Sequence, residues 1–102
     1  MSDAVTVIAT LRAAKGKADA LRALLAEQAA AVRAAEPDCA MYRVHQAADD
    51  PELFVFYEIY ADQAAFDAHR TAPHVAAFRA RRQAEGLVAG PVDMQVVRPI
   101  SE

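Results

Sequence analysis

Three ionisable side chains in one short stretch of the chain could carry acid–base chemistry: Glu58, His69 and His74. Glu58 lies in the apolar run LFVFYEIY at residues 53–60. Burial among aromatic side chains disfavours the charged form of a carboxyl and should raise its pKa. Histidine titrates near neutrality and is the most common general acid or base. The stretch therefore predicts a proton-transfer site in which His69 or Glu58 is the base and His74 assists.

A strand and the helix after it must position these groups. Aromatic and β-branched residues dominate 53–60, which predicts a strand, and both of its faces are apolar. Such a strand should be covered on both sides. Asp62 is expected to cap a helix over residues 63–70, and Pro73 should break it before a second helix from His74 to about Glu85.

The remaining elements complete a ferredoxin-like fold. Period-two patterns predict strands over residues 4–11, 40–46 and 92–100, and Gly90-Pro91 is expected in the turn before the last strand. Leucines at helical spacing predict a helix over 17–35. The order β-α-β-β-α-β indicates an α+β domain over residues 1–102, an antiparallel sheet with its helices on one face. The apolar second face of the central strand then predicts a homodimer that packs sheet against sheet.

Composition limits the partners. The formal net charge is −3, so neither nucleic acid nor an anionic membrane surface is an expected partner. No apolar run approaches the roughly 20 residues of a membrane span. The single cysteine, Cys39, excludes an internal disulfide and, without a recognisable signal peptide, favours a cytoplasmic location.

Several segments resemble the antibiotic biosynthesis monooxygenase (ABM) domain family. They are VIATLRAAKGKADALRALL at 7–25, EPDC at 36–39, and FVFYEIYADQAAFDAH followed by TAPH at 54–74. The resemblance implies a dimeric α/β barrel with a pocket between the sheet and the helices of each subunit. It extends both to quinol monooxygenases and to an isomerase branch that degrades autoinducer-2 phosphate.

The residues can be weighed against the cofactors that such proteins use. At the positions where haem-degrading members carry Asn, Trp and His, this chain has Ala9, His69 and Phe78, and it has no Trp. No glycine-rich phosphate turn for a flavin or nicotinamide is present. His69 and His74, five residues apart across a proline, do not have metal-ligand spacing, although folding could bring them together. We therefore expect no cofactor and no metal.

The expected function is cofactor-independent monooxygenation of a quinol or phenol by O₂. His69, Glu58 and His74 are the expected catalytic residues. The side chains expected to bind the small aromatic or carbonyl substrate are Tyr42, His45, Tyr57, Phe66 and Phe78. Two alternatives stay open: the phospho-dione isomerase, with Arg79, Arg81 and Arg82 as phosphate-binding cations, and a non-catalytic dimer that binds small molecules.

Overall fold

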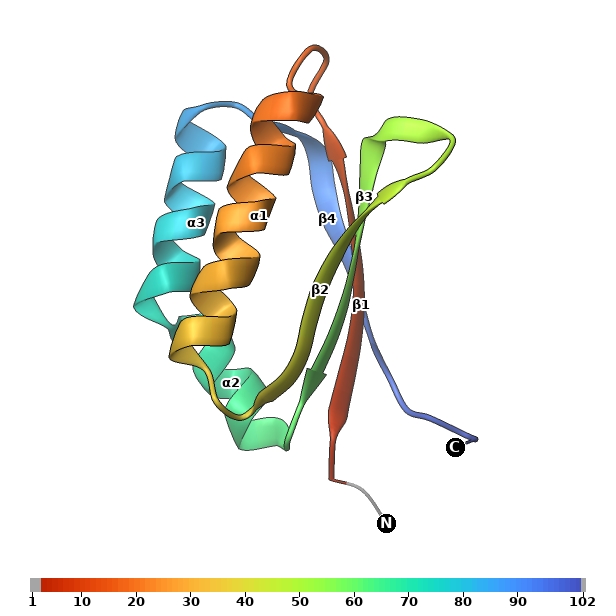
Figure 1. Ribbon diagram of the computed structural model, residues 1–102, viewed down its shortest axis with the longest axis vertical. Coiled ribbons are helices and arrows are strands. Elements are labelled where there is room, and N and C mark those ends of the chain that lie inside the picture. Colours follow the sequence, from red (N-terminus) through yellow and green to blue (C-terminus); the bar gives the residue numbers. More distant parts are fainter. Residues whose placement is uncertain (1–2, 102) are drawn as a thin grey trace.

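The computed structural model describes residues 3–101, so the ends of the predicted 1–102 domain (residues 1, 2 and 102) lie outside the described part. A four-stranded antiparallel sheet of order β2-β3-β1-β4 carries its helices on one side (Figure 1). This confirms the ferredoxin-like prediction. The elements are β1 (Val5–Ala13), α1 (Ala18–Ala35), β2 (Cys39–Ala47), β3 (Asp50–Tyr60), α2 (Gln63–Thr71), α3 (Pro73–Ala84) and β4 (Val88–Val97).

Strand β3 lies inside the sheet between β2 and β1, and its two faces have different surroundings. The side chains at even positions from Phe54 to Tyr60 are buried beneath the helices. Those at odd positions from Leu53 to Ile59 point to the other face, where Tyr57 is 38% exposed. A single chain therefore covers one face of β3, and cover of the other face by a second copy stays a prediction.

Helix α1 forms because its apolar residues recur at three- and four-residue intervals, from Leu21 to Val32, and make one stripe toward the sheet. That stripe packs on β1, β2 and β3 and contributes five of the thirteen buried residues in the larger core cluster. Full burial of each leucine stabilises the fold by about 1.5–3 kcal/mol. Among the helices of residues 3–101, none has the length and apolar character needed to cross a bilayer.

The break between α2 and α3 brings two histidines toward the same place. The Asp62 carboxylate accepts a hydrogen bond from the Ala65 amide at 2.8 Å and so caps α2 as predicted. The residue before a proline avoids the helical region, and Ala72 accordingly has φ −67° and ψ 145°. Pro73 then occupies the first turn of α3, where its missing N–H costs no hydrogen bond. The chain changes direction between His69 and His74.

The prediction for the last strand was wrong at both ends. Strand β4 includes Gly90 and Pro91, which were expected in a turn, and ends at Val97 instead of residue 100. Gly90 has a φ of 74°, and the pairing with β1 shifts register between Thr10 and Arg12. This irregularity, together with the position of β4 at the edge of the sheet, allows a proline within the strand.

Candidate active site

A pocket of about 290 Å³ lies between the helix-side face of the sheet and the helices. Its apolar walls include Leu11, Phe56 and Val75. Of the predicted site residues, five line it: Tyr42, Glu58, Phe66, His69 and Phe78. Strand β3 supplies Glu58, β2 supplies Tyr42, and the helices after β3 supply the other three. An apolar cavity with a few convergent polar groups is the usual form of a small-molecule site.

Glu58 is the buried acid of this pocket, at 6% exposure. Burial raises the pKa of its carboxyl, while the hydrogen bond from Tyr60 and the neighbouring His69 act in the opposite direction. The Tyr60 hydroxyl donates to Glu58 Oε1 at 2.5 Å. Burial and the adjacent Glu58 carboxyl raise the pKa of Tyr60. The phenol therefore stays protonated and can keep donating to the acid.

A second carboxylate, Glu36, holds both histidines. His69 Nδ1 lies 2.9 Å from Glu36 Oε2 and 3.0 Å from Oε1, and His74 Nε2 contacts the same Oε2. The side chains of Glu36, His69 and His74 are only 12%, 10% and 20% exposed. Glu36 follows the last residue of α1, so the end of one helix meets the break between the other two.

The hydrogen bonds to Glu36 fix how His69 presents itself to the pocket. A carboxylate only accepts hydrogen bonds, so the imidazole nitrogen facing it, Nδ1, must carry the proton. In the neutral ring, Nε2 is then the acceptor. This atom has no hydrogen-bond partner among residues 3–101, and the ring lines the pocket between Tyr42 and Tyr60, with centroids 5.7 and 5.1 Å away. The geometry can place a base at the pocket surface.

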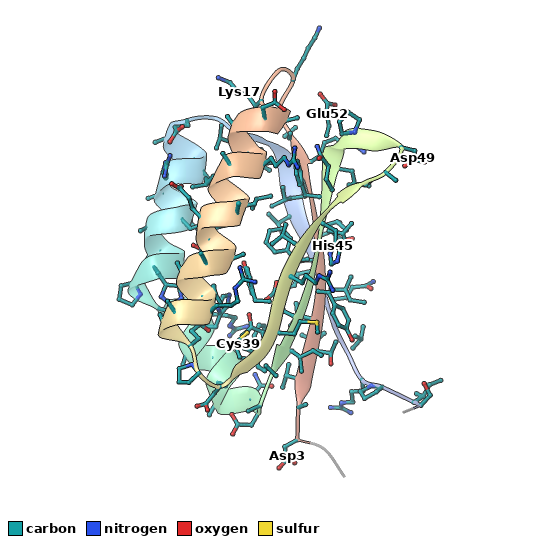
Figure 2. The ribbon with its side chains drawn as sticks, viewed as in Figure 1. Asp3, Lys17, Cys39, His45, Asp49 and Glu52 are labelled. Atoms are coloured by element: carbon teal, nitrogen blue, oxygen red, sulfur yellow. The ribbon has the colours of Figure 1, made fainter. Side chains whose placement is uncertain are left out.

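Three predicted residues lie outside the pocket. His74 instead borders a neighbouring cavity of about 340 Å³ that Glu36 and Cys39 also line. Tyr57 and His45 lie on the opposite face of the sheet, where His45 Nδ1 is 3.3 Å from the carbonyl oxygen of Val55. Figure 2 shows His45 on the side of β2 away from the helices and Cys39 on the helix side. Within one chain, neither His45 nor Tyr57 can reach a substrate in this pocket.

Two functional candidates were missed in the sequence. Glu36 is 33 positions from His69, and no spacing rule connects them. Gln28 occupies a place in the apolar stripe of α1 and lines the pocket, and a polar residue at a core position was the signal that could have found it. Arg79 and Arg82, considered earlier only for a phosphate, also line the pocket, whereas Arg81 does not.

The Glu36 cluster also has the donor set of a divalent metal site. One ligand atom each from Glu36, His69 and His74 lie within 4.8 Å of one another. Two histidines and a carboxylate suit zinc or non-haem iron. Metal binding would have to replace both hydrogen bonds to Glu36, because the imidazole nitrogens that face it would lose their protons.

Nearby, burial raises the pKa of Cys39 to about 11, so its thiol is protonated near neutrality.

Comparisons with known proteins give one consistent result. The family described as antibiotic biosynthesis monooxygenase matches residues 4–81. A protein of Mycobacterium tuberculosis named "Putative monooxygenase Rv0793" is 37% identical over 102 residues, which cover all of this chain and 97% of that protein.

Solved structures show the same similarity in three dimensions. The structure of Rv0793 superimposes with a TM-score of 0.84 at 35% identity and 97% coverage of both chains. PA3566 from Pseudomonas aeruginosa gives a TM-score of 0.85 at 35% identity and covers 99% of this chain and 98% of its own.

Proposed function

Because the chain belongs to the antibiotic biosynthesis monooxygenase family, we propose that it is a cofactor-independent monooxygenase that oxidises a phenol or quinol with O₂. The observation that carries the proposal is the orientation of His69. Glu36 holds Nδ1 in its protonated form, and Nε2 is left as an acceptor on a ring that lines an apolar pocket. This arrangement supports removal of a proton from a hydroxyl group bound there.

The proposed reaction needs no reductant other than the substrate. His69 takes the hydroxyl proton, and the resulting phenolate passes an electron to O₂. The phenoxyl radical and the superoxide formed in this way combine to make a C–O bond at a ring carbon that carries hydrogen. The O–O bond then breaks as that C–H proton leaves, which gives a carbonyl. The distal oxygen departs as water, which carries that C–H proton and the proton held by His69. One oxygen atom ends in the quinone and the other in water, so phenol and O₂ give quinone and water.

Glu58 has a different proposed role. The buried carboxyl of Glu58 accepts a hydrogen bond from Tyr60 and interacts electrostatically with His69. When ionised, it favours the positive charge that His69 acquires with the proton. The phenol of Tyr42 keeps its proton, because burial and Glu58 raise its pKa. Tyr42 is therefore proposed to donate a hydrogen bond to the substrate oxygen.

The proposed enzyme is a homodimer. The sheet face away from the helices carries Met41 and Tyr57, which are 37% and 38% exposed. On the helix side, the edge strand β4 contributes Val92 and Met94 to the pocket, and they are 40% and 49% exposed. Apolar side chains at both places would be covered by a second copy, which would also close the β4 side of the pocket to water.

Oxygen uptake tests the function. Purified protein is screened against phenols and hydroquinones with an oxygen electrode, and ¹⁸O₂ identifies the origin of the new carbonyl oxygen. We expect one labelled atom in the product. His69→Ala should lower turnover at least about tenfold, since a positioned general base contributes about 10²–10⁴-fold.

The matched control is Gln63→Ala in the same helix, at an exposed position whose side chain donates a hydrogen bond to Asp67. It should retain full turnover. Conversion of substrate under nitrogen would instead indicate an isomerase, and saturable binding without oxygen uptake would indicate a binding protein. Either result would overturn the proposal, as would full activity of His69→Ala.

A further inference from the structure

Gln28 is a buried side chain at the pocket whose amide nitrogen has no partner within residues 3–101. The residue is 5% exposed, and its Nε2 makes no hydrogen bond to any part of the chain that the structure describes. It is also one of the side chains that line the pocket. Buried polar atoms are nearly always paired, because an unpaired donor loses its hydration without compensation. An unpaired amide donor on a side chain that lines a cavity therefore suggests a hydrogen-bond acceptor on the ligand.

Three arginines of α3 have unequal surroundings. Arg81 lies outside the pocket and is fully paired, at 2.7 Å from Glu27 and 2.9 Å from Glu85. Arg82, half-buried, lines the pocket, has no acidic partner within residues 3–101 and stacks over the Phe78 ring at 5.4 Å. Arg79 also lines the pocket, and its one hydrogen bond goes to the backbone carbonyl of Arg70 at 3.2 Å. Among the three arginines of α3, the two without an acidic partner within residues 3–101 are therefore the two at the cavity.

Gln28 and Arg82 belong to the same part of the pocket. The ion pair between Arg81 and Glu27 shows that the last turns of α3 lie beside the middle of α1, and Arg82 and Gln28 each follow one residue later. His69 lies at the start of the α2–α3 break, toward the other end of α3, as the antiparallel course of α1 and α3 in Figure 1 shows. The pocket therefore has a donor-rich end and a proton-accepting end.

The electrostatics around Arg82 agree with this geometry. Burial and the neighbouring Arg79 lower the pKa of the Arg82 guanidinium. Both effects disfavour its charge, and a bound anion would favour it.

We propose that Gln28 and Arg82 bind the carboxylate of the substrate, with Arg79 beside them. The substrate of the reaction proposed above is then a phenol or quinol that carries a carboxylate at the end of the ring system opposite to its reacting hydroxyl. A carboxylate offers two acceptor oxygens, which match one amide N–H and one guanidinium. The apolar walls between the two ends accommodate the rings.

Binding under nitrogen tests this inference separately from turnover. The two probes are 6-hydroxy-2-naphthoate and 2-naphthol, which share rings and hydroxyl and differ in the carboxylate. The wild-type chain should bind the carboxylate probe at least about tenfold more tightly by calorimetry, as charge-assisted hydrogen bonds predict. Arg82→Gln and Gln28→Leu should each remove most of that preference and leave the affinity for 2-naphthol within about twofold.

Arg81→Gln is the matched control, because it makes the same change of charge one residue away and outside the pocket. It should keep the preference. Any of four results would overturn the inference. The wild type binds both probes equally or binds neither, Arg81→Gln has the same effect as Arg82→Gln, or Arg82→Gln and Gln28→Leu lose as much affinity for 2-naphthol as for the carboxylate probe. The inference rests on the proposed function for the reaction that the bound substrate undergoes, whereas the binding of its carboxylate is tested without turnover. A preference for carboxylate without oxygen uptake would refute the function alone, and uptake without that preference would refute the inference alone.

Discussion

Replacement of Glu36 by glutamine should destabilise the chain strongly, because one carboxylate serves two imidazoles. In the native protein, Glu36 accepts N–H groups from His69 and His74, and all three side chains are at most 20% exposed. Glutamine has one carbonyl oxygen. With that oxygen toward one imidazole, its NH₂ group faces the N–H of the other, and two donors cannot bond.

The size of the loss follows from these contacts. A hydrogen bond to a charged group contributes about 1.5–3 kcal/mol, and Glu36→Gln loses one such bond and weakens the second to a neutral one. We therefore expect the free energy of unfolding to fall by about 2–4 kcal/mol. For a domain of this size, that corresponds to a decrease in Tm of at least about 8 °C.

Urea and thermal unfolding, followed by circular dichroism at one protein concentration, measure the loss. The control is Glu27→Gln, which removes the same charge from an exposed carboxylate of α1 that pairs with Arg81 and is 63% exposed. Exposed ion pairs contribute at most about 1 kcal/mol, so this variant should remain close to wild type. A Glu36→Gln variant no less stable than Glu27→Gln would refute the reasoning, because the Glu36 contacts would then be energetically neutral.

Three further predictions concern protonation, assembly and metal. The pKa of Glu58 is raised above its usual 4.5, so ionisation of this carboxyl costs the folded chain stability as pH rises through that pKa. Glu58→Gln has no proton to lose at this position. Its stability relative to wild type, measured by urea unfolding, should therefore improve from about pH 4 to about pH 8, whereas a constant difference would argue against a buried acid. Wild-type protein should sediment at equilibrium as about twice 11.0 kDa, and Tyr57→Asp, which puts a charge on the exposed sheet face, should shift it toward the monomer. A wild-type monomer would contradict this assembly. Chelators should leave oxygen uptake unchanged, while added Zn²⁺ should inhibit it by occupying Glu36, His69 and His74. Loss of activity on chelation would show instead that the cluster holds a required metal.

Local patterns in the sequence determined the elements and most of the pocket wall. The alternation from Phe54 to Tyr60 identified the central strand and its helix-side face, and Asp62 and Pro73 set the ends of the helices around His69. These features depend on periods of two and 3.6 residues and on capping chemistry between near neighbours. The order of the elements also predicted the ferredoxin-like antiparallel sheet with its helices on one face, and the structure gives its strand order as β2-β3-β1-β4.

Only the tertiary structure decided which charged groups meet. Glu36 reaches His69 and His74 across 33 and 38 positions, because the end of α1 packs at the α2–α3 break, and no local spacing encodes that contact. The same packing leaves the buried Nε2 of Gln28 unpaired, while Arg81, next to Arg82 in sequence, pairs with Glu27. The sequence specifies the chemistry of each side chain. Hydrogen bonds, however, act over about 3 Å, and only folding brings partners that are distant in sequence within that range.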